Sequence, residues 1–160
     1  MADRLKGKIA IISGGATGMG GASSLLFAAE GAAAGVIDRN KEAGEAVVAQ
    51  ITKAGGKAAF AAADVSDEVQ VNAAVASITS ALGPANVLFN HAGTIIIKPF
   101  LDMTLSEWEW LMGINVRSMF LMTKAVLPLG SCAPVTACSN EIARGSAWVS
   151  GTSASKVPDT

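Results

Sequence analysis

A glycine-rich run near the start of the chain has the residue types and spacing that binding a phosphate requires. Residues 13–20 read Ser-Gly-Gly-Ala-Thr-Gly-Met-Gly. Glycine permits a tight turn and lets the backbone approach a ligand closely. A helix that begins at such a turn directs free N–H groups and the positive end of its dipole at an anion. The run therefore predicts a pyrophosphate-binding turn, with a tight turn that binds no ligand as the alternative.

An aspartate follows where a carboxylate could accept hydrogen bonds from the adenosine ribose of a dinucleotide. Asp38 ends the second apolar run of the chain, within the distance of about 20 residues expected for such a group. A carboxylate there would repel a 2′-phosphate, so Asp38 favours NAD over NADP. The adjacent Arg39 softens that repulsion and keeps NADP as the second choice. The alternative is that Asp38 only starts a loop or caps a helix.

The elements that would position these groups follow from the alternation of apolar runs with helical patterns. Strands are predicted at residues 8–13, 33–38, 57–63, 85–90 and 135–138. Helices are predicted at residues 18–30, 41–54, 67–82 and 105–127, with Ser66 as N-cap of the third and Pro128 closing the fourth. This order predicts an α/β fold, a Rossmann-type doubly wound parallel sheet in three layers, α/β/α.

The domain organisation expected is one dinucleotide-binding (Rossmann) domain over residues 1–160. From residue 130 onward the pattern decays into Ser, Cys, Ala, Thr and Gly. Residues 130–160 are therefore expected to be a degenerate C-terminal segment, and the C-terminal part of the fold to be incomplete.

Composition excludes several classes of protein. The chain is 51% hydrophobic and 16% charged with a net charge of −1, which argues against disorder and against recruitment of nucleic acid. No apolar run reaches the roughly 18 to 20 residues of a membrane span, and the start lacks a signal-peptide core. We expect a cytoplasmic protein. No metal site is expected, because Cys132 and Cys138 match no zinc pattern and His91 lies far from them in sequence.

Three further segments, taken together with the glycine turn at residues 13–20, resemble the short-chain dehydrogenase/reductase family. The spacing of the three glycines at 14, 18 and 20 is that family's version of the dinucleotide fingerprint. Residues 63–65 (Ala-Asp-Val) resemble its adenine contact. Residues 90–93 (Asn-His-Ala-Gly) resemble its Asn-Asn-Ala-Gly segment, with His91 replacing an asparagine that supports the turn and sheet. Asn115 sits where the family keeps a structural and proton-relay asparagine. The resemblance extends over residues 1–127.

The resemblance implies an NAD(P)-dependent oxidoreductase that transfers hydride between a nicotinamide cofactor and a small carbonyl or hydroxyl compound. It implies a homo-oligomer, with Trp108 and Trp110 in core or subunit packing. It also implies that the segment of residues 93–102 lies near the cofactor, where its apolar character would suit a mostly apolar substrate. The cofactor-binding residues implied are Gly14, Thr17, Gly18, Met19, Gly20, Asp38, Arg39, Asp64, Val65, Asn90, Ala92 and Gly93.

The resemblance breaks at the catalytic residues. The family uses a serine, a tyrosine and a lysine, and this chain contains no tyrosine. Residues 152–156 resemble the family's Tyr-x-x-x-Lys segment with Thr152 in the tyrosine position, which leaves Ser139, Lys156 and Asn115 as the catalytic positions. An aliphatic hydroxyl ionises far less readily than a phenol, so Thr152 is a poor replacement. The alternative for Ser139 and Lys156 is a capping serine and a solvated lysine.

Two readings of function therefore remain open beside the oxidoreductase: a non-catalytic nucleotide-binding fragment or pseudoenzyme, and an incomplete fold with no function of its own. Pro158 would break the helix that forms much of the family's dimer interface, which argues against the homo-oligomer here. The resemblance also implies two further strands and a substrate-covering loop, which we do not expect the 160 residues to supply. A fragment, an error in the sequence and a natural truncated paralogue would each explain this.

Overall fold

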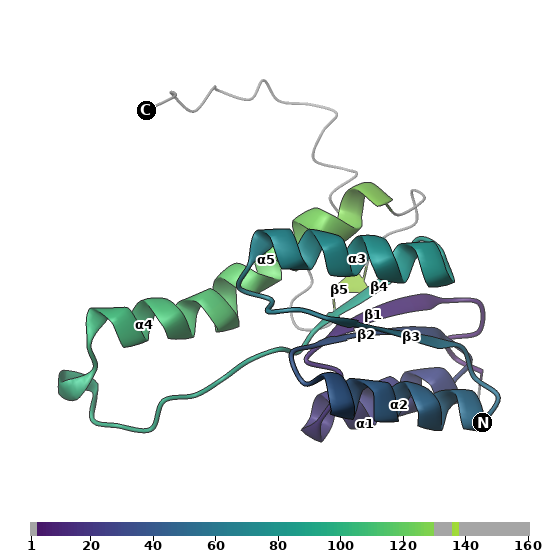
Figure 1. Cartoon of the computed structure of the whole chain (residues 1–160), viewed down its shortest axis with the longest axis horizontal. Coiled ribbons are helices and arrows are strands. Elements are labelled where there is room, and N and C mark those ends of the chain that lie inside the picture. The colour runs from purple at the N-terminus through teal and green to yellow at the C-terminus, as the bar shows by residue number, and fades with distance from the viewer. Residues whose placement is uncertain (1–2, 130–135, 138–160) are drawn as a thin grey trace.

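Strands and helices alternate along the chain, as the apolar pattern predicts. The computed structural model describes residues 3–129 and 136–137. Its strands are β1 (Ile9–Ser13), β2 (Ala33–Asp38), β3 (Ala58–Ala62), β4 (Val87–Asn90) and β5 (Thr136–Ala137). Its α-helices are α1 (Gly18–Ala29), α2 (Lys41–Lys53), α3 (Glu68–Leu82), α4 (Leu105–Met112) and α5 (Ser118–Val126) (Figure 1).

The strands form one parallel sheet with the order β3-β2-β1-β4-β5. The central strand β1 pairs with β2 on one side, where Ile11 lies opposite Gly35, and with β4 on the other, where Ile11 lies opposite Leu88. The chain therefore builds the sheet outward from β1 first in one direction and then in the other. The crevice between β1 and β4, at the carboxyl ends of the strands, is the switch point where open α/β sheets bind ligands.

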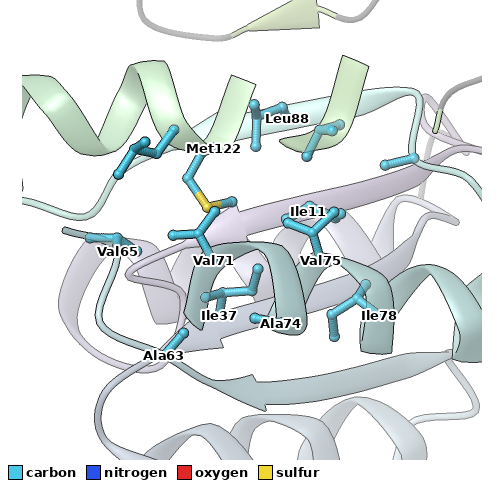
Figure 2. Close-up of a cluster of buried hydrophobic side chains, with 13 residues drawn as sticks. Ile11, Ile37, Ala63, Val65, Val71, Ala74, Val75, Ile78, Leu88 and Met122 are labelled. Atoms are coloured by element: carbon cyan, nitrogen blue, oxygen red, sulfur yellow. The ribbon is translucent and has the colours of Figure 1, made fainter. Parts of the chain in front are cut away.

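Helices cover both faces of the sheet, with α1 and α2 on one face and α3 and α5 on the other (Figure 1). Neighbouring residues of β1 point to opposite faces. Ile11 packs with Val71, Leu88 and Met122 beneath α3 and α5 (Figure 2), whereas Ile12 packs with the cluster under α1 and α2. The predicted three-layer α/β Rossmann-type fold is thus confirmed.

The predicted N-cap of α3 is wrong by one residue. Asp67 caps this helix, and its carboxylate accepts hydrogen bonds from the N–H groups of Val69 and Gln70. The Ser66 hydroxyl instead donates to Asp64 Oδ1 at 2.7 Å. A carboxylate accepts two N–H groups and interacts favourably with the helix dipole, which a single hydroxyl cannot match.

The predicted helix at 105–127 is helical along its length but changes winding in the middle. A π-helical turn (Gly113–Arg117), which contains Asn115, separates α4 from α5, and a 3-10 turn (Leu127–Leu129) containing Pro128 follows α5. π turns are rare and occur frequently at functional sites. In the described part of the chain, every helix is too short or too polar to span a bilayer.

Helix α4 projects away from the sheet, together with the segment that leads into it (Figure 1). Lys98 Nζ contacts both carboxylate oxygens of Glu107 at 2.8 Å, and Thr104 forms a capping box with Glu107. Lys98 and the Thr104 hydrogen bonds lower the pKa of Glu107 to about 2. Glu107 therefore stays charged and holds residues 98–104 against the start of α4 at neutral pH.

Candidate dinucleotide-binding site

A cavity of about 360 Å³ lies at the switch point, at the carboxyl ends of β1, β2 and β4. It is lined by the glycine turn, the ends of β2 and β3 and the segment after β4. The lining residues are Gly14, Thr17, Gly18, Met19, Asp38, Arg39, Ala63, Asp64, Val65, His91, Ala92, Gly93, Thr94 and Ile114. The fold thus brings together residues that are far apart in the sequence.

The structure places the implied cofactor-binding residues on this cavity, with two exceptions. Gly20 lies behind the turn rather than on it, and Asn90, at the end of β4, is not among the lining residues. Asn115 lies just behind the cavity, next to Gly93. Ser139 and Lys156 lie outside the described residues.

The glycines of the turn serve different purposes. Gly14 and Gly18 both have positive φ, +66° and +53°. A β-carbon at Gly14 would lie 2.8 Å from the Cα of Ala92, whereas one at Gly18 would meet no atom within 4 Å. A β-carbon at Gly20 would collide with the Gly14 carbonyl oxygen. Gly14 and Gly20 therefore allow close packing of the protein on itself, whereas Gly18, which lines the cavity, has open space at its β-carbon position.

Helix α1 begins at this cavity without a side-chain cap. Its N-cap residue is Thr17, whose side chain makes no capping hydrogen bond, and its first turn contains no acidic residue. By contrast, Asn40, Asp67 and Thr104 cap α2, α3 and α4 with their side chains. The first-turn N–H groups of α1 have no intrahelical acceptor. An uncapped helix start beside a glycine open to the cavity fits the pyrophosphate of a dinucleotide.

Two serines that the sequence analysis did not single out hold the turn in place. The buried Ser24 donates its hydroxyl to the Gly15 carbonyl oxygen at 2.9 Å. The buried Ser13 accepts hydrogen bonds at Oγ from the backbone N–H groups of His91 and Ala92, at 3.2 and 3.3 Å. Their positions in the sequence could have indicated this role. Ser13 directly precedes the turn, and Ser24 is a polar residue one helical turn after Gly20 on an otherwise apolar helix.

The end of the cavity formed by the ends of β2 and β3 carries two carboxylates and one guanidinium, those of Asp38, Asp64 and Arg39. The hydrogen bond from the Ser66 hydroxyl is the main cause that holds the pKa of Asp64 below its usual value, and the Arg39 charge acts in the same direction. Arg39 lies 3.9 Å from Asp64. Asp38 accepts hydrogen bonds from the backbone N–H groups of Ala16 (3.1 Å) and Asn40 (2.9 Å). Asn40, not Asp38, caps α2.

The opposite end of the cavity is fixed by the π turn. Asn115 Oδ1 accepts a hydrogen bond from Thr94 N–H at 2.7 Å, and Asn115 Nδ2 donates to the Thr94 carbonyl oxygen at 2.8 Å. This pair anchors the chain after β4 to the helix. The His91 ring stacks on Phe89 at 5.4 Å between centroids and packs under α1 near Gly20, which is a packing role.

A parallel α/β/α sheet with a glycine turn at its switch point defines a Rossmann-type protein. The family model described as short chain dehydrogenase matches residues 8–158, and the chain belongs to this oxidoreductase family.

Two curated relatives of the chain are dehydrogenases by name. The chain is 41% identical over 128 residues to a 2,5-dichloro-2,5-cyclohexadiene-1,4-diol dehydrogenase of Sphingobium indicum, a match that covers 80% of this chain and 51% of the relative. It is 40% identical over 124 residues to a cyclopentanol dehydrogenase of Comamonas testosteroni, covering 78% and 50%. The chain therefore spans about half the length of the curated relatives it matches.

Solved structures of dehydrogenases/reductases superpose on this chain. A dehydrogenase/reductase from Sinorhizobium meliloti superposes with a TM-score of 0.77 at 31% identity, covering 81% of this chain and 52% of that one. A short-chain dehydrogenase/reductase mutant from Serratia marcescens gives a TM-score of 0.75 at 30% identity, covering 79% and 52%.

Proposed function

We propose that this chain binds NAD as the cofactor-binding part of a short-chain dehydrogenase. The observation that carries the proposal is Gly18, a cavity-lining residue with a positive φ and open space at its β-carbon position, which lies at the uncapped start of α1. Thr17 and the first-turn N–H groups would hold the pyrophosphate, Asp38 the adenosine ribose, and Asp64 and Val65 the adenine. When bound, NAD supplies the hydride chemistry, and the protein orients it.

The substrate we propose is a small hydroxyl or carbonyl compound of mostly apolar character. The two relatives named above are, by name, dehydrogenases of a cyclic diol and of a cyclic alcohol. The segment that follows Gly93 carries the exposed Ile95 and Ile97, and Ile114 lines the cavity beside it. Ile114 is an apolar side chain on the cavity wall. Ile95 and Ile97 are exposed on the segment that continues from this wall, where they would meet an apolar substrate outside the cavity.

A second candidate function is nucleotide binding without turnover. The absence of tyrosine from all 160 residues favours it, because the family's proton donor is then missing from this chain. Both candidates require the same NAD site, so they differ only in whether hydride transfer follows binding.

Calorimetric titration with NAD and NADP tests the cofactor choice. The Asp38 carboxylate would face a 2′-phosphate, so we expect NAD to bind at least about tenfold more tightly, or roughly 1.4 kcal/mol. Asp38→Asn removes the charge and should reduce this preference. Asp102→Asn removes a carboxylate that is not part of the cavity and should preserve it. Equal or tighter binding of NADP, or an unchanged preference in Asp38→Asn, would contradict the assignment.

A further inference from the structure

We propose that Asp38 is also a positioning residue, whose carboxylate holds the phosphate turn in its binding conformation before any ligand arrives. This inference rests on the proposed function, because it concerns the same turn. Asp38 Oδ2 accepts a hydrogen bond from the backbone N–H of Ala16 at 3.1 Å, 22 residues away in sequence. Oδ1 accepts one from the N–H of Asn40 at 2.9 Å, which fixes the carboxylate at the end of β2.

The Ala16 N–H depends on this partner. Ala16 is only 6% exposed, so in the folded protein its N–H group has the Asp38 carboxylate as its acceptor rather than bulk water. A buried donor left without an acceptor carries the full cost of its desolvation. Without the Asp38 carboxylate, the peptide before Ala16 would have to turn toward solvent, and the backbone leading to Gly18 would turn with it.

Other contacts hold the turn before Ala16 but not at Ala16 itself. The N–H of Gly14 donates to the Ile37 carbonyl oxygen at 2.8 Å, and Ser24 holds the Gly15 carbonyl. Ala16 lies between these contacts and the exposed residues Thr17 and Gly18, which face the cavity. The Asp38 bond is thus the last tertiary constraint before the residues that would contact the phosphates.

The positioning role is compatible with ribose binding. An ionised carboxylate has two oxygens and about four acceptor sites, and the two backbone amides occupy only two of them. The remaining sites would accept the ribose hydroxyls. One side chain therefore couples the ribose and pyrophosphate ends of the cavity, and the ordered turn lowers the entropic cost of binding.

Amide hydrogen exchange in the ligand-free protein tests the inference without reference to any ligand. In Asp38→Ala, the Ala16 amide should exchange about tenfold faster or more, because it loses its acceptor. Asp38→Asn retains an acceptor oxygen and should restore part of the protection. Asp64→Ala removes a carboxylate from the same cavity but not from Ala16 and should leave Ala16 exchange unchanged. Equal exchange of Ala16 in wild type and Asp38→Ala, with the core amides of β1 still protected, would overturn the inference.

Two ligands that differ only in their ribose hydroxyls distinguish the positioning role of Asp38 from a direct contact of Asp38 with the ribose. ADP carries the ribose hydroxyls, and 2′,3′-dideoxyadenosine 5′-diphosphate lacks both. If Asp38 orders the turn, Asp38→Ala should weaken binding of the dideoxy compound by about tenfold, and that of ADP by more. Unchanged affinity for the dideoxy compound would mean that Asp38 serves the ribose alone. Failure of both compounds to bind the wild type would count against the proposed function, and the exchange of Ala16 would still decide the positioning role.

Discussion

The substitution Gly18→Ala is expected to weaken NAD binding roughly 100-fold while the protein remains folded. Gly18 lines the cavity, has φ +53° and has no atom within 4 Å of the position of a β-carbon, so we expect the added methyl group to occupy space that the pyrophosphate would need. It would hold the pyrophosphate away from the first-turn N–H groups of α1. Loss of two charge-assisted hydrogen bonds at about 1.5 kcal/mol each corresponds to roughly 100-fold weaker binding, measurable by calorimetry.

Gly55→Ala is the matched control for this change. Gly55 also has a positive φ, +86°, and open space around its β-carbon position, but it follows α2 at the other end of the sheet. Both variants should therefore lose similar stability, about 1 kcal/mol for an alanine in the left-handed region. Only Gly18→Ala should lose NAD. Normal NAD binding by a folded Gly18→Ala protein would show that this turn does not bind the phosphates. Gly14→Val is unsuitable, because its side chain would strike the Ala92 backbone rather than fill the cavity.

The second large effect expected is on turnover: this chain should reduce carbonyl compounds with NADH at no more than a background rate. It contains no tyrosine, so the general acid that the family resemblance implies is missing. Loss of a positioned general acid costs about 100- to 10,000-fold in rate. The measurement is NADH oxidation against a panel of ketones and aldehydes, with NAD binding confirmed in the same preparation.

Two variants sharpen this prediction, although Thr152 and Lys156 lie outside the described residues. If the wild type turns over and Lys156→Ala abolishes that turnover, the prediction is wrong and Lys156 or Ser139 must supply the proton. Conversely, Thr152→Tyr should restore some activity when the remaining elements of the family fold are supplied in a longer chain. No gain in that setting would show that Thr152 does not occupy the tyrosine position.

Much of the fold could be predicted from the sequence because it depends on local patterns. The apolar runs 8–13 and 33–38 and the glycine turn between them specify a βαβ unit, and the structure forms β1, α1 and β2 there. The prediction of Ser66 as the N-cap of α3 was wrong because serine and aspartate both cap helices. In the structure Asp67 is the cap, and the Ser66 hydroxyl donates to Asp64 instead. The π turn, and the pairing of its Asn115 with Thr94, follow from contacts between distant segments, which periodicity does not indicate.

The sequence predicts most of the residues that line the candidate site, but it does not predict what each of them does there. The three glycines of the fingerprint look equivalent in the sequence, yet a β-carbon would clash with the protein at Gly14 and Gly20 and would meet open space at Gly18. The contact between Asp38 and Ala16 joins residues from two different elements, so it depends on the packing of β2 against the turn. Ser13 and Ser24 were missed for the same reason, since their hydroxyls act on backbone groups that only the fold brings near.

An NMR titration of the isotopically labelled chain with NAD tests the central claim most directly, because it reports both binding and place. We expect saturable shifts of the amide signals of Gly18, Met19 and Gly93, which line the cavity at the carboxyl ends of the strands. Signals around a second cavity of about 680 Å³ at the other end of the sheet, such as those of Gly31 and Gly55, should stay in place. Saturable shifts confined to that second cavity, or no shifts at millimolar NAD, would contradict the assignment of this chain as an NAD-binding protein.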